Sequence, residues 1–355
     1  MRQIDAGNPY LGNSGSTRSW ITAAGLSAAA LFAATKLAGS MRRRPVNLRG
    51  KVALITGGSR GLGLALAHEL GEYGCELALV ARDPAELTGA ATRLNRRGTE
   101  ATTFPCDITH ADEIEPLLQR VIQRFGRIDI LVNDAGMIKT APFDNVERKD
   151  FDEAMDLMFW APVNLTLAAL PHLRRSPEAH IVNITSVGGR VSVPHLLPYC
   201  CAKFAFVAFS TGLSSELDPD KVHVLTVVPG LMRTGSYLNA QFKGPKEQEF
   251  AWFSALSTLP GLTVSAEHAA RSIRQALQRR HLTSTISMPA KLLIQSEALL
   301  PEATRTIMHL VNQYALPGAN QDQSEKSGKA LNSRFGGLFQ SLTALGRLAA
   351  RALNQ

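Results

Sequence analysis

The sequence predicts an α/β fold, in which a doubly wound parallel sheet is flanked by helices on both faces. Three observations lead to this prediction. Short apolar runs alternate with amphipathic stretches from Lys51 onward, a glycine-rich turn follows the first run, and 45% of the 355 residues are hydrophobic against 19% charged. Such a composition is typical of a globular protein with a sizeable core. Regular alternation of strand and helix requires parallel strands joined by right-handed crossovers.

The apolar and β-branched runs predict the strands in chain order. These runs are 51–56, 76–81, 101–106, 129–133, 180–185 and 222–228, and a helix at 266–280 with a short run at 283–288 is expected to complete the sheet. Beyond Pro289 the strand pattern stops. We expect one or two amphipathic helices in 291–315, a polar linker over 317–329 and a last amphipathic helix over 335–353. Ligands of such sheets bind at the carboxyl ends of the strands.

The first 45 residues differ from the rest, so we divide the chain into 1–45, a Rossmann-type domain at 46–290 and a helical extension at 291–355. The first 50 residues hold seven basic side chains against Asp5 alone, which leaves only +2 of the net charge of +8 for the remaining 305. With 6% aromatic residues and an almost neutral body, we do not expect nucleic-acid binding.

Residues 20–41 predict a single membrane span, because about 20 mostly apolar residues cross a bilayer. Three arginines at 42–44 would hold the following domain in the cytoplasm. A cleaved targeting segment and a disordered tail are the alternatives, and the latter leaves a soluble cytoplasmic protein. The four cysteines have neither disulfide nor zinc spacing, so we expect no metal site.

The turn at 56–63, Thr-Gly-Gly-Ser-Arg-Gly-Leu-Gly, predicts a dinucleotide-binding loop. Gly57 permits the tight turn, Gly61 allows the backbone to approach a pyrophosphate, and Gly63 allows close packing of helix on strand. The free amides of the helix that begins here would face the phosphates.

The end of the second strand favours NADP(H), with NAD(H) as the alternative. An NAD enzyme usually places an acid here for the ribose hydroxyls, whereas this chain has Arg82, with Asp83 one position later. Arg82 and Arg60 can form a cationic pocket for a 2′-phosphate. Asp107, directly after the third strand, is placed to meet the adenine amino group.

Four further motifs follow in order, and together with the loop they resemble the short-chain dehydrogenase/reductase (SDR) family over about 51–288. They are Asn133-Asp134-Ala135-Gly136 (Asn-Asn-Ala-Gly in the family), Ser186, Tyr199-x-x-x-Lys203, and Pro229-Gly230 with Thr234. The resemblance implies an oxidoreductase that moves a hydride between a nicotinamide and a secondary alcohol or ketone. It also implies a homo-oligomer. The cofactor-binding residues expected from the loop and the resemblance are Gly57, Ser59, Arg60, Gly61, Leu62, Gly63, Arg82, Asp107, Asn133, Ala135, Gly136, Tyr199, Lys203, Pro229, Gly230 and Thr234.

The resemblance makes Ser186, Tyr199 and Lys203 the catalytic residues. A phenol with a pKa near 10 is a poor base at neutral pH, and a nearby cation favours its ionised form. Lys203 lies one helical turn beyond Tyr199 and can supply that cation. Ser186 can orient the substrate oxygen.

One departure from the family pattern leaves a second hypothesis open. Met158 occupies the position of a fourth catalytic residue, an asparagine, and Pro162 is expected to kink the same helix. The proton relay behind Lys203 would then use the Met158 carbonyl and a water. The alternative is a non-catalytic NADP-binding or scaffold protein with this fold, and a third hypothesis is epimerisation or dehydration with bound cofactor.

Two further patterns bear on the substrate. Residues 231–262 are expected to form a lid whose Phe242, Phe250, Trp252 and Phe253 favour an apolar carbonyl or alcohol. The apolar face of 335–353 predicts a helix that lies at a membrane interface, with docking on the protein as the alternative. His195, just before Tyr199, is a candidate for the wall of the substrate cleft.

Overall fold

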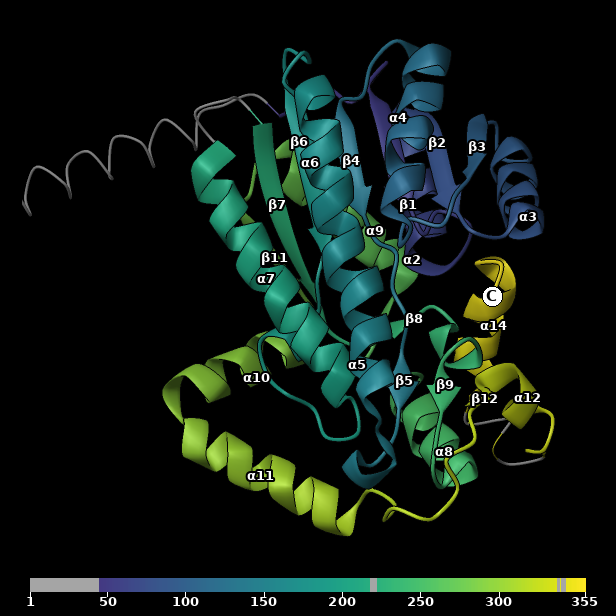
Figure 1. Ribbon diagram of the computed structural model, residues 1–355, viewed down its shortest axis with the longest axis vertical. Helices are drawn as coiled ribbons and strands as arrows, with labels where there is room; N and C mark the ends of the chain where they lie inside the picture. The colour runs from purple at the N-terminus through teal and green to yellow at the C-terminus, as the bar shows by residue number, and fades with distance from the viewer. Residues whose placement is uncertain (1–44, 218–221, 337–338, 340–342) are drawn as a thin grey trace, which may run out of the picture. The chain divides into compact units, whose positions relative to one another are not determined.

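The computed structural model describes residues 45–217, 222–336, 339 and 343–355, and residues 46–355 form one unit. Its main sheet has seven parallel strands in the order β3–β2–β1–β4–β6–β7–β11 (Figure 1). The strands are β1 (Val52–Thr56), β2 (Glu76–Ala81), β3 (Ala101–Pro105), β4 (Ile130–Asn133), β6 (Ala179–Ile184), β7 (Val222–Pro229) and β11 (Thr283–Ile286). The order reverses between β1 and β4, which confirms the doubly wound fold.

Helices cover both faces of this sheet because its strands are apolar on both sides. On β1, Ala53 and Ile55 point to one face and Leu54 to the other, as the two-residue period of a strand requires. The first face carries α2 (Gly61–Glu72), α3 (Pro84–Asn95) and α9 (Ala266–Gln278). The second carries α4 (Ala111–Phe125), α6 (Ala161–Leu173) and α7 (Leu197–Leu217), with α5 (Arg148–Met155) packed on α7 (Figure 1).

Pro162 predicts a kink in the long helix that contains Met158. The structure shows an interruption of this helix just before Pro162. A π-helical turn (η2, Asp156–Trp160) separates α5 from α6, and Pro162 lies in the first turn of α6. Proline lacks an amide hydrogen and is tolerated only at the beginning of a helix. The backbone hydrogen bonds of the helix therefore change to the π-helical pattern in the turn before Pro162.

A smaller layer lies at the carboxyl edge of the main sheet and joins distant parts of the chain. Three two-residue strands form one sheet, β5 (Lys139–Thr140), β9 (Gln241–Phe242) and β12 (Lys326–Ser327). Beside them are β8 (Met232–Arg233), β10 (Val264–Ser265), α8 (Lys246–Leu256), α12 (Gly328–Asn332) and α14 (Ala344–Ala352). Short 3₁₀ turns are η1 (Phe143–Asn145), η3 (Val187–Gly189) and η5 (Ser236–Leu238).

Three expectations for the end of the chain need correction. The predicted linker 317–329 contains β12 and the start of α12. The predicted helix over 335–353 is wrong at its start, because Phe335 and Gly336 lie in no helix; within the range, α14 begins at Ala344. The last predicted strand ends at Ile286, because Ser287 caps α10 (Met288–Leu299), which is followed by α11 (Pro301–Tyr314). These two helices are the ones expected in 291–315.

Among the described residues of 335–353, three large apolar side chains pack inside the protein, whereas Leu345 and Leu348 are exposed. Phe335 and Phe339 stack near Phe250, at centroid distances of 5.3 and 5.8 Å, and Leu353 belongs to the core beneath α2. This matches the alternative in which the segment docks on the protein. Among the described residues, no helix has both the length and the apolar character to cross a bilayer. The span predicted at 20–41 lies outside the described residues.

Candidate active site

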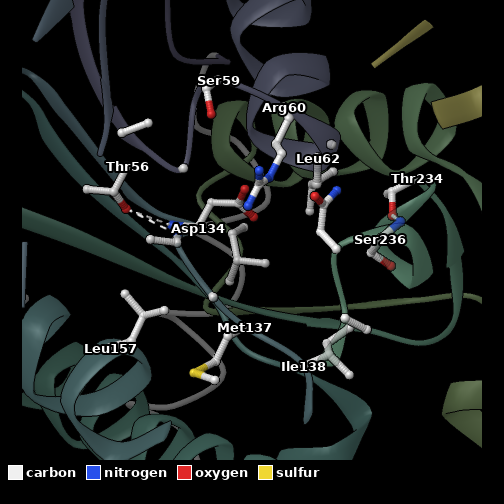
Figure 2. Close-up of a pocket in the computed structure, with 18 of the residues that line it drawn as sticks. Thr56, Ser59, Arg60, Leu62, Asp134, Met137, Ile138, Leu157, Thr234 and Ser236 are labelled. Atoms are coloured by element: carbon white, nitrogen blue, oxygen red, sulfur yellow. Dashed lines mark hydrogen bonds between the residues drawn. The ribbon is translucent and has the colours of Figure 1, made fainter. Parts of the chain in front are cut away.

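A cavity of about 780 Å³ opens at the carboxyl edge of the main sheet, beside the β1–β4 switch point. Its size is within the roughly 300–1,000 Å³ of small-molecule sites. Ser59 and Arg60, from the glycine-rich loop, lie at one end of the cavity, and the apolar side chains of Met137 and Leu157 lie at the other (Figure 2). Of the predicted site residues, all line this cavity except Gly63 and Asn133.

The loop at 57–63 (the phosphate loop) is held by close backbone contacts that only glycine allows. Gly57 has a φ of +70° and Gly61 of +58°, conformations that side chains disfavour. A Cβ on Gly63 would lie 2.3 Å from the Gly57 carbonyl oxygen, so α2 starts directly against the turn. Thr56 Oγ1 accepts hydrogen bonds from the amides of Asp134 (3.1 Å) and Ala135 (3.3 Å), which ties the ends of β1 and β4 together.

Asn133 lies beneath the cavity, and its side chain contacts other parts of the fold instead of lining the cavity. Its Nδ2 donates to Asn183 Oδ1 at 2.9 Å and to Thr166 Oγ1 at 3.3 Å, and the side chain is buried. It therefore links β4 to β6 and α6. The sequence pattern does not distinguish a residue that supports the site from one that lines it.

Two arginines lie at the adenosine end, as expected, but both have acidic neighbours. Arg60 Nη1 donates to Glu86 Oε1 at 2.5 Å, and Ser59 Oγ donates to the other oxygen of Glu86 at 3.1 Å. Arg82 is mostly exposed, with Nη1 3.8 Å from Asp107 Oδ2. Partial burial raises the pKa of Asp107, but hydrogen bonds from Thr109 and the Arg82 charge outweigh it, so the pKa is lowered and the group is anionic.

Ser186, Tyr199 and Lys203 meet at the other end of the cavity. Ser186 follows β6, while Tyr199 and Lys203 lie one turn apart on α7. Burial raises the pKa of Tyr199 to about 12, although a hydrogen bond with the Ser186 hydroxyl lowers it in part. The Lys203 ammonium lies 5.9 Å from the Tyr199 ring centroid and donates to the Ile184 carbonyl at 2.9 Å.

Asp134 is a site residue that the sequence reasoning missed. It lines the cavity beside Lys203, whose charge lowers its pKa, but burial dominates and raises that pKa to about 8. Burial likewise lowers the pKa of Lys203 to about 8, against the attraction of Asp134. The signal for Asp134 was its departure from the second asparagine of the family motif.

Met158 is buried among apolar neighbours, in a cluster that includes Met137 and Tyr199. Its thioether sulfur lies 3.7 Å from the point where a Cβ on Gly136 would be. A thioether is at best a weak acceptor and donates no hydrogen bond. The side chain therefore packs the base of the site and supplies no polar link behind Lys203.

The predicted aromatic lid is wrong in its orientation. Phe242, Phe250 and Phe253 are buried in a separate core with Tyr237 and Leu331, and none of the four predicted lid aromatics lines the cavity. His195 is also buried elsewhere, with Nδ1 2.6 Å from Glu249 Oε1. The sequence shows that these aromatic residues cluster over 242–253, but not into which part of the protein their side chains pack.

Residues from the later part of the chain complete the cavity wall. Those at 236–241 lie within the segment predicted as a lid, but none of these wall residues was predicted individually. They are Ser236, Leu238, Asn239, Ala240, Gln241, Ser327, Lys329 and Gln355. Most of them follow or form two-residue strands and short turns, which leave no periodic signal in a sequence.

A doubly wound sheet with a glycine loop at its switch point defines a dinucleotide-binding domain, and the glycine loop and a cavity of about 780 Å³ fit such a group. The sequence pattern of the short chain dehydrogenase family matches residues 51–241. The chain belongs to this family, which confirms the resemblance seen in the sequence.

Individual relatives agree with the family assignment. The chain is 35% identical over 190 residues to a fatty acyl-CoA reductase of Acinetobacter baylyi, which covers 53% of this chain and 64% of that protein. It is 35% identical over 191 residues to 11-beta-hydroxysteroid dehydrogenase-like 3 of Arabidopsis thaliana, covering 53% and 61%. The match thus spans less than two thirds of these relatives' lengths.

Solved structures show the same fold. A short-chain dehydrogenase from Streptomyces avermitilis superposes with a TM-score of 0.62 at 27% identity, covering 75% of this chain and 98% of that one. A metagenomic short-chain oxidoreductase in complex with NADP gives 0.50 at 33% identity, covering 52% and 84%. The likeness thus extends to a protein that holds a nicotinamide dinucleotide.

Proposed function

We propose that this protein is an NADP(H)-dependent oxidoreductase that interconverts a secondary alcohol and a ketone. The observation that carries the proposal is the meeting of Ser186, Tyr199 and Lys203 in one cavity with the phosphate loop. The nicotinamide, when bound, accepts or delivers the hydride. The loop glycines, Ala135, Gly136, Pro229, Gly230 and Thr234 would hold the cofactor.

The three polar side chains manage the proton and the substrate oxygen. Tyr199, whose pKa is raised to about 12, keeps its proton at neutral pH and is ready to donate it to a substrate oxygen in the direction of carbonyl reduction. Lys203 supplies positive charge 5.9 Å from the centre of the Tyr199 ring, and such a charge favours loss of the phenol proton. Ser186 orients the substrate oxygen by a hydrogen bond.

Substitution of Tyr199 by phenylalanine tests this assignment. Tyr199→Phe removes the proton donor and keeps the ring, so turnover of ketones should fall at least a hundredfold while NADPH affinity stays within a factor of a few. Steady-state kinetics and NADPH fluorescence titration measure the two quantities. Turnover at the wild-type rate would refute the proposed mechanism.

The preference for NADP(H) is supported by the two arginines at the adenosine end. Arg82 is exposed toward the cavity and Arg60 lies within it, although Glu86 and Asp107 partly neutralise them. Arg82→Asp should therefore weaken NADPH relative to NADH by about tenfold or more, because an anion would repel the 2′-phosphate. An unchanged ratio of the two dissociation constants would favour NAD(H).

The substrate is proposed to be an apolar carbonyl or alcohol, and the support comes from aliphatic side chains of the cavity wall instead of the four lid aromatics. Met137, Ile138, Leu157 and Leu238 form the apolar wall beyond the catalytic group. An activity screen of long-chain, steroid and small polar carbonyls tests this. A preference for small polar substrates would contradict it.

A non-catalytic NADP-binding protein is the second candidate, and Met158 is the observation that favours it. The buried thioether offers no amide behind Lys203. NADPH binding without turnover across a broad carbonyl panel, together with activity gained by Met158→Asn, would support this candidate. Interconversion of a substrate without any net change in nicotinamide absorbance would instead indicate epimerisation or dehydration.

Two proposals concern the whole protein. Residues 20–41 would tether it to a membrane with the site in the cytoplasm. Recovery of the full chain in the soluble fraction of a lysate would overturn this.

Exposed Trp160, Leu167 and Phe204 on the outer side of η2, α6 and α7 support a homo-oligomer formed through these helices. Sedimentation of a monomer at micromolar concentration would contradict it.

A further inference from the structure

The residues Leu353, Asn354 and Gln355 (the 353–355 segment) follow α14 and lie against the phosphate loop. The Leu353 carbonyl accepts a hydrogen bond from the Gly61 amide at 2.9 Å. Asn354 Nδ2 donates to the carbonyl oxygens of Ser59 and Glu86, both at 3.0 Å. The segment is thereby attached to the loop and to the first turn of α3.

The same segment also reaches the opposite wall of the cavity. Gln355 Oε1 accepts a hydrogen bond from Asn239 Nδ2, and Asn239 follows the 3₁₀ turn Ser236–Leu238. The backbone amide of Gln355 donates to the Ala350 carbonyl at 3.0 Å, and the backbone of Asn354 lies in the left-handed region (φ 60°). This geometry closes the end of α14 and fixes the direction of the segment. The 353–355 segment thus joins the phosphate loop to the wall that carries Asn239.

The Gln355 side-chain nitrogen lies directly over the loop. A Cβ built on Gly61 would be 2.7 Å from Gln355 Nε2, and Gln355 lines the cavity. An amide nitrogen carries two N–H donors. Within the part of the chain that the structure describes, Nε2 has no protein acceptor, whereas Oε1 is used by Asn239. A donor in this place, beside the amino end of α2, suits an anionic oxygen.

We propose that Gln355 is a cofactor-binding residue, whose Nε2 donates a hydrogen bond to the pyrophosphate of the nicotinamide dinucleotide. Leu353 and Asn354 position it by their bonds to the phosphate loop. The inference rests on the proposed function, because it requires a dinucleotide in this cavity. Gln355 lies well beyond residue 241, where the family match ends, so this contact is contributed by a part of the chain that the family pattern does not describe.

Titration of the full chain with NADPH tests the inference without turnover. Gln355→Ala should raise the dissociation constant about tenfold, the usual effect of losing a hydrogen bond to a charged group. The change should appear as faster dissociation in a stopped-flow chase. Gln119→Ala, a glutamine on the surface of α4, is the matched control and should bind NADPH like the wild type.

Adenosine 2′-phosphate separates a pyrophosphate contact from a general distortion of the loop, because it lacks a pyrophosphate. Its affinity should be unchanged in Gln355→Ala. Gln355→Glu, which keeps the size and replaces the donor by a carboxylate, should weaken NADPH more than the alanine variant and leave the melting temperature near that of the wild type.

Each outcome bears on a different statement. Wild-type affinity for NADPH in both Gln355 variants would overturn the inference, and so would an equal loss for NADPH and adenosine 2′-phosphate. Failure of the wild type to bind either NADPH or NADH would instead overturn the proposed function, and the inference with it.

Discussion

Asp134 and Lys203 place an acid and a base in one cavity, and burial disfavours the charged form of each. The pKa of the acid is raised to about 8 and that of the lysine lowered to about 8. An asparagine at 134 would keep the shape without the charge. At this position the chain therefore carries a group whose protonation changes within the pH range of ordinary assays.

Asp134→Asn should change how stability depends on pH. In the unfolded chain Asp134 loses its proton near pH 4, whereas in the folded protein it retains the proton up to about pH 8. Between these values the folded state binds more protons, so this residue makes stability decrease as pH rises. The variant should therefore be more stable than the wild type at pH 8 and about equally stable near pH 4.

Urea unfolding at pH 5, 7 and 8.5 measures this difference. A gain that does not grow with pH would show that Asp134 is solvated and already ionised at pH 5. Asn95→Asp, at the exposed end of α3, is the control for a change of one charge, and its effect should be small throughout.

At the scale of an element, α3 explains why the acid expected for an NAD enzyme is displaced by one position. Asp83 is the N-cap of this helix: its Oδ1 accepts from the amides of Ala85 (2.8 Å) and Glu86 (3.3 Å). Pro84 follows in the first turn, where its missing amide hydrogen costs nothing. The Asp83 carboxylate thus caps α3, and the residue that directly follows β2 is Arg82.

Asp83→Ala should destabilise the protein by about 1 kcal/mol, because two amides of the first turn lose their acceptor. Asp83→Asn retains an acceptor oxygen and should recover most of that loss. Thermal or urea unfolding gives both values. If NADH affinity fell more than stability in Asp83→Ala, the carboxylate would be a ribose ligand and not a cap.

At the scale of the whole molecule, the main sheet and the phosphate loop could be predicted from the sequence, whereas the smaller layer could not. Buried parallel strands are continuous apolar runs, so the bounds of β2 were predicted to the residue and those of the other strands of the main sheet to within two residues. The strands β5, β9 and β12 have two residues each and no periodicity. Their pairing depends on long-range contacts, and so does the placement of Gln355 at the cavity.

The separate core around Phe250 indicates that the aromatic residues of α8 stabilise the fold and do not contact the substrate. Phe250 is fully buried and contacts Tyr237, Phe242, Phe335 and Phe339. Phe250→Ala should therefore cost about 3–5 kcal/mol of stability. Below its melting temperature the variant should keep its KM for apolar substrates. A raised KM with unchanged stability would restore the lid interpretation.

The three-stranded sheet β12–β9–β5 has a consequence for the order in which the protein becomes functional during synthesis. Its strands come from residues 139–140, 241–242 and 326–327, and each contributes or adjoins a wall residue of the cavity (Ile138, Gln241 and Ser327). Domains form as the chain leaves the ribosome, and contacts between distant segments form late. The seven-stranded sheet has all its strands once residue 286 has emerged. Ser327 of the cavity wall follows about forty residues later, and Gln355 completes the wall about thirty residues after that. A nascent chain therefore carries its phosphate loop before it has a complete pocket.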